Sequence, residues 1–192
     1  MPDTVIKVHF ESIDSTHAWM KRARTIFGTE SRVRLTANGQ TAGHGRFKRR
    51  WVSPPGVNIY VTYFFTVRKN PLLFPQLARK LCLIISAALE GYGLTPCIKE
   101  PNDVLIKEKK IAGVLAEVVD PGGKNDERNG LILSMGINVN MSQYTVRSLS
   151  QSIGREITSI LAEGVTVDRK ELLRHLDDLM LEHFCAPGKP NP

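Results

Sequence analysis

Strand-like runs that follow one another with short polar breaks constrain the fold of this 192-residue chain most. Runs that alternate in polarity or are rich in β-branched and aromatic residues are predicted as strands: 5–10, 32–37, 58–66, 97–99, 104–107, 111–119 and 130–138. The charged pair Glu108–Lys109 predicts a tight turn between two of them. This succession excludes regular strand–helix alternation, so we expect an α+β fold with a mixed, largely antiparallel sheet and helices.

Helices are predicted where capping residues precede an apolar face. Residues 14–16 (Asp-Ser-Thr) can cap a helix over 17–24, and Pro75 opens an apolar helix that ends after Leu89. Asp168 begins a final amphipathic helix. Its apolar face is predicted to contain Leu172, Leu173, Leu176, Leu179, Met180 and Phe184.

Length and composition limit the organisation of the chain. Residues 1–192, of which 42% are hydrophobic, suffice for a single domain with a buried core, and we expect the tail 185–192 to be frayed. Three widely spaced cysteines argue against disulfides and a zinc site and favour a reducing compartment. The N-terminal segment shows no signal peptide and no stretch is long and apolar enough to span a membrane, so we expect a cytoplasmic protein without a membrane partner.

The segment 39–58 carries the strongest functional signal. Three glycines are followed by four basic residues and Trp51. Glycine amides and guanidinium groups both donate hydrogen bonds to phosphate or carboxylate oxygens, and a net charge of +7 also favours anionic partners. The spacing differs from the phosphate loop of nucleotide-binding proteins. An anion-binding loop is the preferred interpretation, and a nucleic-acid-binding module with 46–51 as a basic, aromatic patch is the alternative.

Four blocks of sequence, taken in order, resemble the catalytic domain of biotin protein ligases. They are 14–16 (Asp-Ser-Thr), 43–51 (Gly-His-Gly-Arg-Phe-Lys-Arg-Arg-Trp), 99–103 (Lys-Glu-Pro-Asn-Asp) followed by 109–117, and 136–140 (Gly-Ile-Asn-Val-Asn). The match runs from about residue 8 to the final helix. It implies a class II synthetase-like biotin ligase core.

The resemblance also implies a two-step reaction. Biotin and ATP, with Mg²⁺, first form biotinyl-5′-AMP and pyrophosphate. The biotinyl group then passes to a specific lysine of a biotin carboxyl carrier protein, as in acetyl-CoA carboxylase. The expected partners are therefore biotin, ATP and this carrier, not DNA, and a homodimer is left open.

Residues of the first two blocks are implied to bind biotin. Ser15, Thr16 and His17 meet the ureido ring in the resembling family, and Gln40 meets it from the far side. A urea needs both donors and acceptors, which hydroxyl and amide side chains supply. The implied loop over biotin and its adenylate consists of Gly43, His44, Gly45 and Arg46. Taken alone, Ser15 and Thr16 would more often be a helix cap.

The later blocks are implied to act on the carboxylate and the nucleotide. Lys110 contacts the carboxylate being activated, and Gly113 lets the backbone approach the ligand. The catalytic residues are then Lys110, Arg46 and Asp103, with Asp103 near the metal or the attacking carrier lysine. The implied nucleotide-binding residues are Arg49, Trp51, Lys99, Asn102, Asn138 and Asn140. Without the resemblance, a solvated lysine would be the default in the basic run that contains Lys110, and Asn102 after Pro101 would be part of a turn. A core position is about as frequent as a ligand contact for a residue such as Trp51.

Departures from the family pattern keep alternatives open. His44 stands where family loops usually carry arginine, and Glu100 stands where many members carry tryptophan. We expect no N-terminal DNA-binding domain and no small C-terminal β-domain within this chain, which describes a minimal ligase or a piece of a longer one. The rival activities are a lipoate or octanoate ligase or transferase of the same fold, and a catalytically dead relative.

Overall fold

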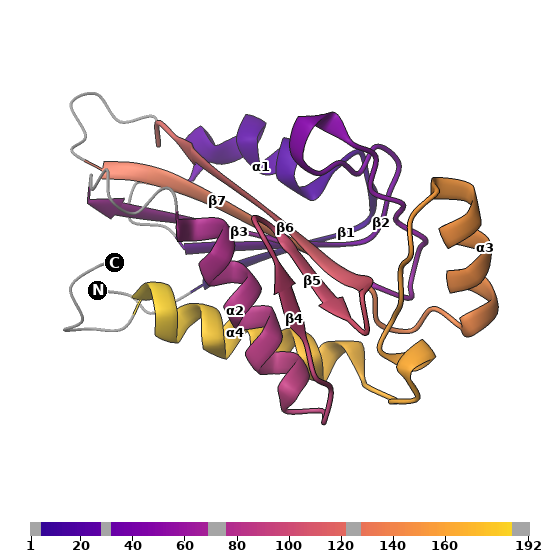
Figure 1. Ribbon diagram of the computed structural model, residues 1–192. Helices are drawn as coiled ribbons and strands as arrows, with labels where there is room; N and C mark the ends of the chain where they lie inside the picture. Colours follow the sequence, from indigo (N-terminus) through magenta and orange to yellow (C-terminus); the bar gives the residue numbers. More distant parts are fainter. Residues whose placement is uncertain (1–4, 28–31, 69–75, 122–127, 186–192) are drawn as a thin grey trace. The chain divides into compact units, whose positions relative to one another are not determined.

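A computed structural model describes residues 5–27, 32–68, 76–121 and 128–185 (Figure 1). Its seven-stranded sheet has the order β1-β2-β3-β7-β6-β5-β4. The strands are β1 (Val5–Ile13), β2 (Arg32–Gln40), β3 (Ile59–Arg68), β4 (Cys97–Lys99), β5 (Asp103–Ile106), β6 (Lys109–Val119) and β7 (Arg128–Ile137). The α-helices are α1 (Thr16–Ala23), α2 (Leu77–Glu90), α3 (Gln143–Ile153) and α4 (Arg169–Cys185). Pro75 and the tail 186–192, on which two expectations fall, lie outside the described residues.

The α+β fold with a mixed, largely antiparallel sheet is confirmed. β1 and β2 run parallel, whereas β2 with β3, β4 with β5 and β5 with β6 pair antiparallel. The predicted strands are all present within a few residues of their expected ends. The turn between β5 and β6 lies at Lys107–Glu108, one residue earlier than predicted. Both residues have positive φ angles (47° and 64°), the backbone that a two-residue hairpin turn requires.

The chain divides into two compact units, and each is described by itself. The first comprises Met1–Gly56, Tyr60–Leu77 and Leu115–Met135. The second comprises Val57–Ile59, Ala78–Val114 and Gly136–Pro192. The single-domain organisation expected from length stays a prediction.

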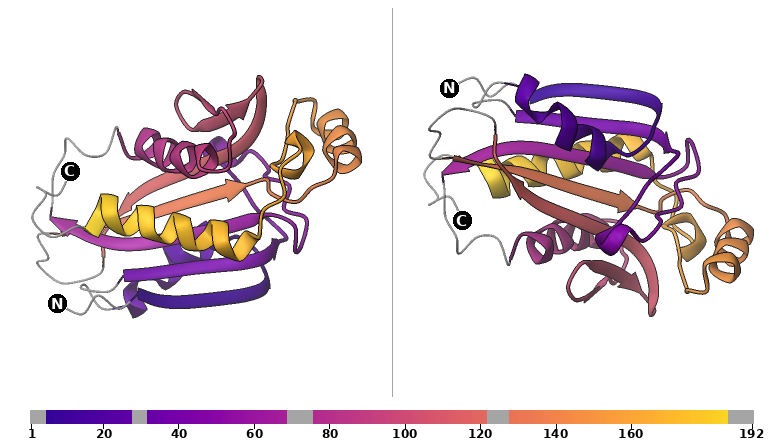
Figure 2. Two further views of the ribbon diagram at one scale, coloured as in Figure 1. Left: turned by 90° about the horizontal axis from the view of Figure 1, so that it is seen from below. Right: turned by 90° about the horizontal axis from the view of Figure 1, so that it is seen from above.

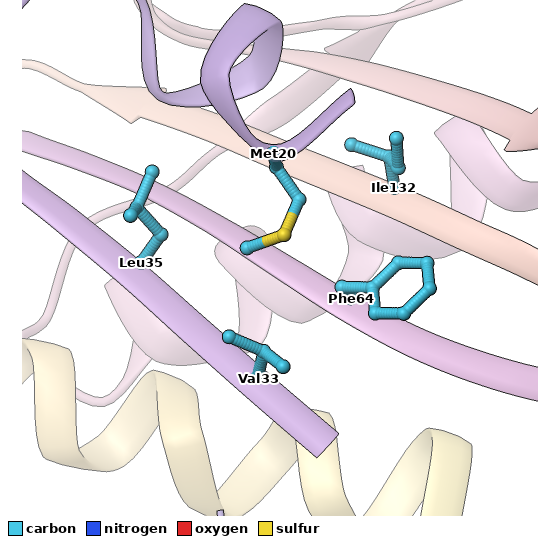
Figure 3. Packing of buried hydrophobic residues seen from close by; sticks show 5 residues of the cluster. All are labelled: Met20, Val33, Leu35, Phe64 and Ile132. Atoms are coloured by element: carbon cyan, nitrogen blue, oxygen red, sulfur yellow. The ribbon is translucent and has the colours of Figure 1, made fainter. Parts of the chain in front are cut away.

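The first unit is built around an apolar cluster between α1 and its strands (Figure 3). The buried members of this cluster are Met20, Val33, Leu35, Phe64 and Ile132. Their alternation along β2 places every second side chain on the α1 side of the sheet, as the twofold period of a strand requires. β1 and β2 lie side by side in this unit (Figure 2). Because Ser15 caps α1 next to this core, the helix N-terminus is held in place.

The second unit contains α2 and α4, which lie side by side (Figures 1 and 2). The Lys80 ammonium donates to the carbonyl oxygen of His183 (2.9 Å) and lies 4.6 Å from the centre of the Phe184 ring. The buried positions of α4 recur every four residues: Leu172, Leu176, Met180 and Phe184. Leu173 and Leu179, predicted on the same face, are only half-buried. Within the described ranges, no helix combines the length and the apolar character that a bilayer span needs.

Helix α3 was not predicted. It begins after Ser142, whose hydroxyl accepts from the Thr145 amide (3.2 Å), and it ends at Gly154 in the left-handed conformation (φ 63°). Val146 is its main buried apolar residue and packs with Met141 and Ile157. Val146, Leu149 and Ile153 recur at the spacing of one helix face, so the apolar period and the two capping residues were both readable signals.

Candidate functional site

The predicted site residues fall into two groups, one in each unit. The first unit holds the residues implied to meet the biotin ring and the loop over it. The second unit holds the residues implied to meet the carboxylate and most of the nucleotide. Each group is therefore built up from the residues of its own unit.

The Gln40 side chain connects the start of α1 to Ser53, which lies just after the glycine- and arginine-rich residues 43–51. Gln40 is the last residue of β2, and its Oε1 accepts from the Thr16 amide (2.9 Å) and from the Thr16 hydroxyl (3.2 Å). Its Nε2 donates to the hydroxyl of Ser53 (3.0 Å). Ser15 and Thr16 are almost fully buried. The predicted residues Ser15, Thr16 and Gln40 are thus brought together, and Ser53 joins them although the sequence did not single it out.

His17 belongs to a buried polar chain of the first unit. Its Nδ1 lies 2.8 Å from the hydroxyl of Ser134, which in turn lies 2.8 Å from the hydroxyl of Thr62. Its Nε2 lies 2.9 Å from a carboxylate oxygen of Glu117, which also pairs with Lys21. Both ring nitrogens of His17 therefore contact protein groups. These surroundings favour a supporting role for His17 over direct contact with a ligand ring. Its side chain supports the start of α1 instead.

Burial lowers the pKa of His17 below its usual 6.5, although the Glu117 carboxylate opposes that shift. Unfolded chains take up this proton near pH 6.5 while the folded chain resists it, so stability falls as the pH drops below that value. We expect the free energy of unfolding to fall more between pH 7.5 and 5.5 in the wild type than in His17→Gln. Urea denaturation at both pH values measures this. Equal losses in the two proteins would contradict it.

The glycine-arginine loop, residues 43–51, is a small hairpin. The Trp51 amide donates to the Gly43 carbonyl oxygen (2.8 Å), and the Gly45 amide donates to the Arg49 carbonyl oxygen (2.8 Å). Its tip, residues 46–48, is exposed, and the Arg46 and Arg49 guanidinium groups lie 5.1 and 5.9 Å from the centre of the Phe47 ring. The tip therefore presents cations to solvent. His44 lies near the base of this hairpin, and the centre of its ring is 6.1 Å from that of the His17 ring.

Gly43 is required by close packing rather than by backbone angle. A Cβ atom there would lie 2.7 Å from the Ser53 hydroxyl, 2.9 Å from the Gln40 amide nitrogen and 2.9 Å from the Trp51 carbonyl oxygen. A Cβ on Gly45 would meet no heavy atom within 4 Å. Only the first glycine lets the loop backbone approach the Gln40 side chain this closely.

The two glycines form a matched pair for a stability test. Gly43→Ala is expected to lower the free energy of unfolding by about 1–3 kcal/mol, because the backbone at Trp51 and the amide of Gln40 must move. Gly45→Ala is expected to change it by less than about 0.5 kcal/mol. Thermal and urea unfolding of both variants measure the difference. If Gly43→Ala is as stable as Gly45→Ala, the packing argument is wrong.

Lys110 and Asp103 form a buried ion pair in the second unit. Lys110 lies near the start of β6 and Asp103 begins β5, and each residue is only 9% exposed. The Lys110 ammonium contacts Oδ1 of Asp103, and a guanidinium nitrogen of Arg155 donates to Oδ2. Burial lowers the pKa of Lys110, and the Asp103 carboxylate opposes this. The solvated-lysine interpretation therefore does not hold for Lys110, whereas it fits its exposed neighbours Lys107 and Lys109.

The predicted asparagine residues of the second unit form hydrogen bonds with backbone carbonyl oxygens of neighbouring segments. Asn102 donates through Nδ2 to the Val114 carbonyl oxygen (3.1 Å), and Asn138 donates through Nδ2 to the Thr158 carbonyl oxygen (2.9 Å). The Asn140 amide donates to the Val57 carbonyl oxygen (2.8 Å). Asn102 and Asn138 thus fasten neighbouring segments, a role that the spacing of the motif did not reveal.

The Lys-Glu-Pro-Asn-Asp block bends back towards α2. Glu100 accepts from the Arg79 Nε (3.1 Å), so the carboxylate that departs from the family pattern is paired at the surface. Lys99 is exposed at the end of β4, and Gly113 lies opposite Asp103 in the β5–β6 register. Glu100 is therefore neutralised by a neighbour of its own unit.

The residues present do not fit a resident metal site. Both carboxylate oxygens of Asp103 face cations, and among the described residues no three His, Cys, Asp or Glu side chains gather to hold a metal ion. Asp103, predicted near the metal, is therefore better described as the partner of Lys110 and Arg155.

Sequence reasoning missed several residues that the structure adds to these groups. Ser53, Ser134 and Thr62 are scattered in sequence and carry no motif. Glu117 closes one of the quoted blocks, so its position was visible but its partner His17 was not. Arg155 lies in a segment to which no element had been assigned.

Comparisons with known proteins identify the family and the relatives of this chain. Residues 9–140 match the Biotin/lipoate A/B protein ligase family. The chain is 29% identical over 162 residues to the bifunctional ligase/repressor BirA of Escherichia coli (strain K12), covering 83% of this chain and 47% of that protein. The chain spans about half the length of the curated relatives it matches.

Solved structures show the same fold. The biotin protein ligase of Aquifex aeolicus in complex with biotin and ATP superposes with a TM-score of 0.68 at 31% identity, over 92% of this chain and 69% of that one. The biotin protein ligase of Leishmania major in complex with biotinyl-5-AMP superposes with a TM-score of 0.71 at 25% identity, over 95% and 75%. The predicted biotin ligase-like core is confirmed.

Proposed function

The chain belongs to the Biotin/lipoate A/B protein ligase family, and from this membership we propose that it is a biotin protein ligase. It activates biotin with ATP as biotinyl-5′-AMP and transfers the biotinyl group to a lysine of a biotin carboxyl carrier protein. Relatives of similar sequence and fold are named for this ligation or were solved with biotin and ATP or with biotinyl-5-AMP. The free thiols Cys82 and Cys97 suit a reducing compartment, which favours the cytoplasm as the site of the reaction.

The observation that carries the proposal is the buried Lys110. Burying the charge of a lysine that is only 9% exposed costs free energy unless an anion accompanies it, and Lys110 shares the Asp103 carboxylate with Arg155. A substrate carboxylate next to Lys110 would add a second negative charge to this cluster. We assign Lys110 to the biotin carboxylate, where its ammonium orients the attacking oxygen and stabilises the oxygen that comes to bridge carbon and phosphorus.

The first step needs positioning and charge rather than a protein nucleophile. A carboxylate oxygen of biotin attacks the α-phosphorus of ATP, a new carboxyl–phosphate bond forms, and the bond to pyrophosphate breaks. Negative charge grows on the phosphoryl oxygens. We assign Arg46 to the carboxylate and α-phosphate, and Arg49 to the departing phosphates, because Arg46 lies at the tip of the glycine-arginine loop, Arg49 directly follows the tip, and both are exposed. Mg²⁺ bound to ATP supplies further neutralisation.

The second step releases AMP. The uncharged amine of the carrier lysine attacks the carbonyl carbon, an amide bond forms, the bond to AMP breaks, and the amine loses a proton to solvent. A mixed anhydride is readily hydrolysed, so the glycine-arginine loop is proposed to shield it from water. The Ser15, Thr16, Gln40, Gly43 and Ser53 group is assigned to the ureido ring, since it offers donors and acceptors together.

The nucleotide contacts are assigned by exposure. Lys99 and Arg49 present side chains to solvent and suit phosphate oxygens, and Trp51, half-buried at the base of the loop, suits the adenine. Asn102, Asn138 and Asn140 are assigned the support of the backbone beneath the nucleotide, because the structure shows them bound to neighbouring segments.

The purified chain tests this function directly. Incubation with ATP, Mg²⁺ and biotin is expected to release pyrophosphate and to yield biotinyl-5′-AMP by mass spectrometry. Addition of carrier domain is expected to increase the carrier mass by one biotinyl group. Lipoate in place of biotin is the competing arm, since the family includes both ligases. Pyrophosphate release in the presence of lipoate but not of biotin would make the chain a lipoate ligase. If neither acid causes release, ligase activity is refuted.

A further inference from the structure

Arg155 connects the end of α3 to the buried pair Lys110 and Asp103. It follows Gly154, and its amide donates to the Ser150 carbonyl oxygen (3.2 Å). Its guanidinium donates to Oδ2 of Asp103, while the Lys110 ammonium contacts Oδ1 of the same carboxylate. One carboxylate thus holds two cations that come from different elements of the same unit.

The backbone next to Arg155 is held to Lys110 as well. The Lys110 amide donates to the Glu156 carbonyl oxygen (3.1 Å), and the Thr158 amide donates to the Lys110 carbonyl oxygen (2.9 Å). The Ile157 amide donates to the buried hydroxyl of Ser150 (3.1 Å). The backbone that follows Arg155 is therefore tied to the backbone of Lys110 by two hydrogen bonds.

We propose that Arg155 is a positioning residue for substrate activation: it holds one oxygen of Asp103 so that the other oxygen aims the Lys110 ammonium at the substrate carboxylate. This inference rests on the proposed function. Arg155 has no counterpart in the four blocks of sequence that suggested the site. It acts through Asp103 and Lys110 rather than by touching the reacting atoms.

The physical reason is that the Asp103 carboxylate would be free to rotate if Lys110 were its only partner. A carboxylate that faces only Lys110 can turn both oxygens towards the ammonium and form a closed pair. The ammonium is then drawn towards Asp103 and away from the substrate. With Arg155 on Oδ2, only Oδ1 remains for Lys110, and the two cations outnumber the carboxylate that they share. An added anion is attracted to such a cluster.

Arg155→Met tests the inference, because it removes the charge and keeps most of the side-chain length. We expect kcat for biotinyl-AMP formation to fall about 10- to 100-fold, the order of loss that small misplacements of a catalytic group cause. The KM for biotin is expected to change less than about threefold. Arg155→Lys is expected to recover most of the rate, since a cation then still occupies Oδ2 of Asp103.

Lys107→Met is the matched control. Lys107 precedes the same hairpin strand and makes an ion pair with Glu163 (2.9 Å), yet it contacts neither Asp103 nor Lys110 in the described structure. Its loss is expected to leave kcat within about twofold of the wild type, because Lys107 touches neither of the residues through which Arg155 is proposed to act. Equal kcat losses in Lys107→Met and Arg155→Met would reduce Arg155 to a general structural residue and overturn the inference. Urea unfolding of every variant confirms that the compared proteins are folded.

A double-mutant cycle with Asp103→Asn decides whether Arg155 acts through Asp103. We expect Arg155→Met to cost less than about threefold in the Asp103→Asn background, because the carboxylate that it orients is gone. A full additional loss there, or a wild-type kcat in Arg155→Met alone, would overturn the inference. If the wild type activates neither biotin nor lipoate, the proposed function itself fails and the inference fails with it. If it activates lipoate, the same cycle is run with that acid.

Discussion

Lys110→Ala is expected to abolish biotinyl-AMP formation, with kcat/KM reduced by about 10³-fold or more, and to leave the chain folded. The ammonium is assigned to the reacting carboxylate, so its loss removes both orientation and stabilisation of charge at the reacting oxygen. Breaking a buried ion pair often costs several kcal/mol, because a charge is left uncompensated. Here Arg155 still pairs with Asp103 after Lys110 is removed, so we expect the unfolding cost to be lower, about 1–2 kcal/mol.

Lys109→Ala is the control for this experiment. Lys109 is the exposed residue before Lys110 on the same strand, so it matches the sequence context without the burial. Biotin-dependent pyrophosphate release measures both variants, and thermal unfolding reports whether they are folded. Near-normal turnover in Lys110→Ala, or an equal loss in Lys109→Ala, would remove Lys110 from the mechanism.

Arg46→Gly is expected to release activated biotin from the enzyme and to increase the labelling of non-target lysines. Arg46 is exposed at the tip of the glycine-arginine loop and makes no ion pair with any described residue, so its charge is available to an anionic ligand. Its loss removes a cation from the adenylate, and glycine also loosens the turn. We expect a rise of about tenfold or more in biotin incorporated into a bystander protein, since one charged hydrogen bond changes retention by roughly this factor.

Lys48→Gly provides the comparison. It removes a positive charge from the same tip, and glycine suits its positive φ angle of 56°. Bystander labelling by Lys48→Gly is expected to stay within about twofold of the wild type, because no contact with the adenylate is assigned to Lys48. Mass spectrometry of bystander protein incubated with each variant, biotin and ATP gives the measurement. Unchanged target selectivity in Arg46→Gly would count against Arg46 as the guard of the intermediate.

Local patterns predicted most of the secondary structure. The β-branched run that became β3 and the capped helix α1 both follow from short-range preferences, so their positions were readable. The β5–β6 turn was placed one residue late, because a charged pair marks a turn without showing which residues take positive φ angles. Helix α3 was missed, although the spacing of Val146, Leu149 and Ile153 and the capping residues Ser142 and Gly154 marked it.

The candidate site was predicted only in part. The motif resemblance named Lys110, Thr16 and Gln40, and the structure places the last two in direct contact. His17 was expected at a ligand ring, yet both its nitrogens contact protein side chains that are distant in sequence. Asn138 was expected at the nucleotide, yet its amide binds the backbone at Thr158.

By itself, the sequence determined the kind of chemistry this chain can support, because residue types and local spacing establish charge, donors, turns and strand periodicity. Only the tertiary structure decided that Lys110 is buried and Lys109 exposed, and that Asp103 is shared with Arg155 from the end of α3. Burial and ion pairing depend on contacts between residues far apart along the chain, and local preferences carry no information about such contacts.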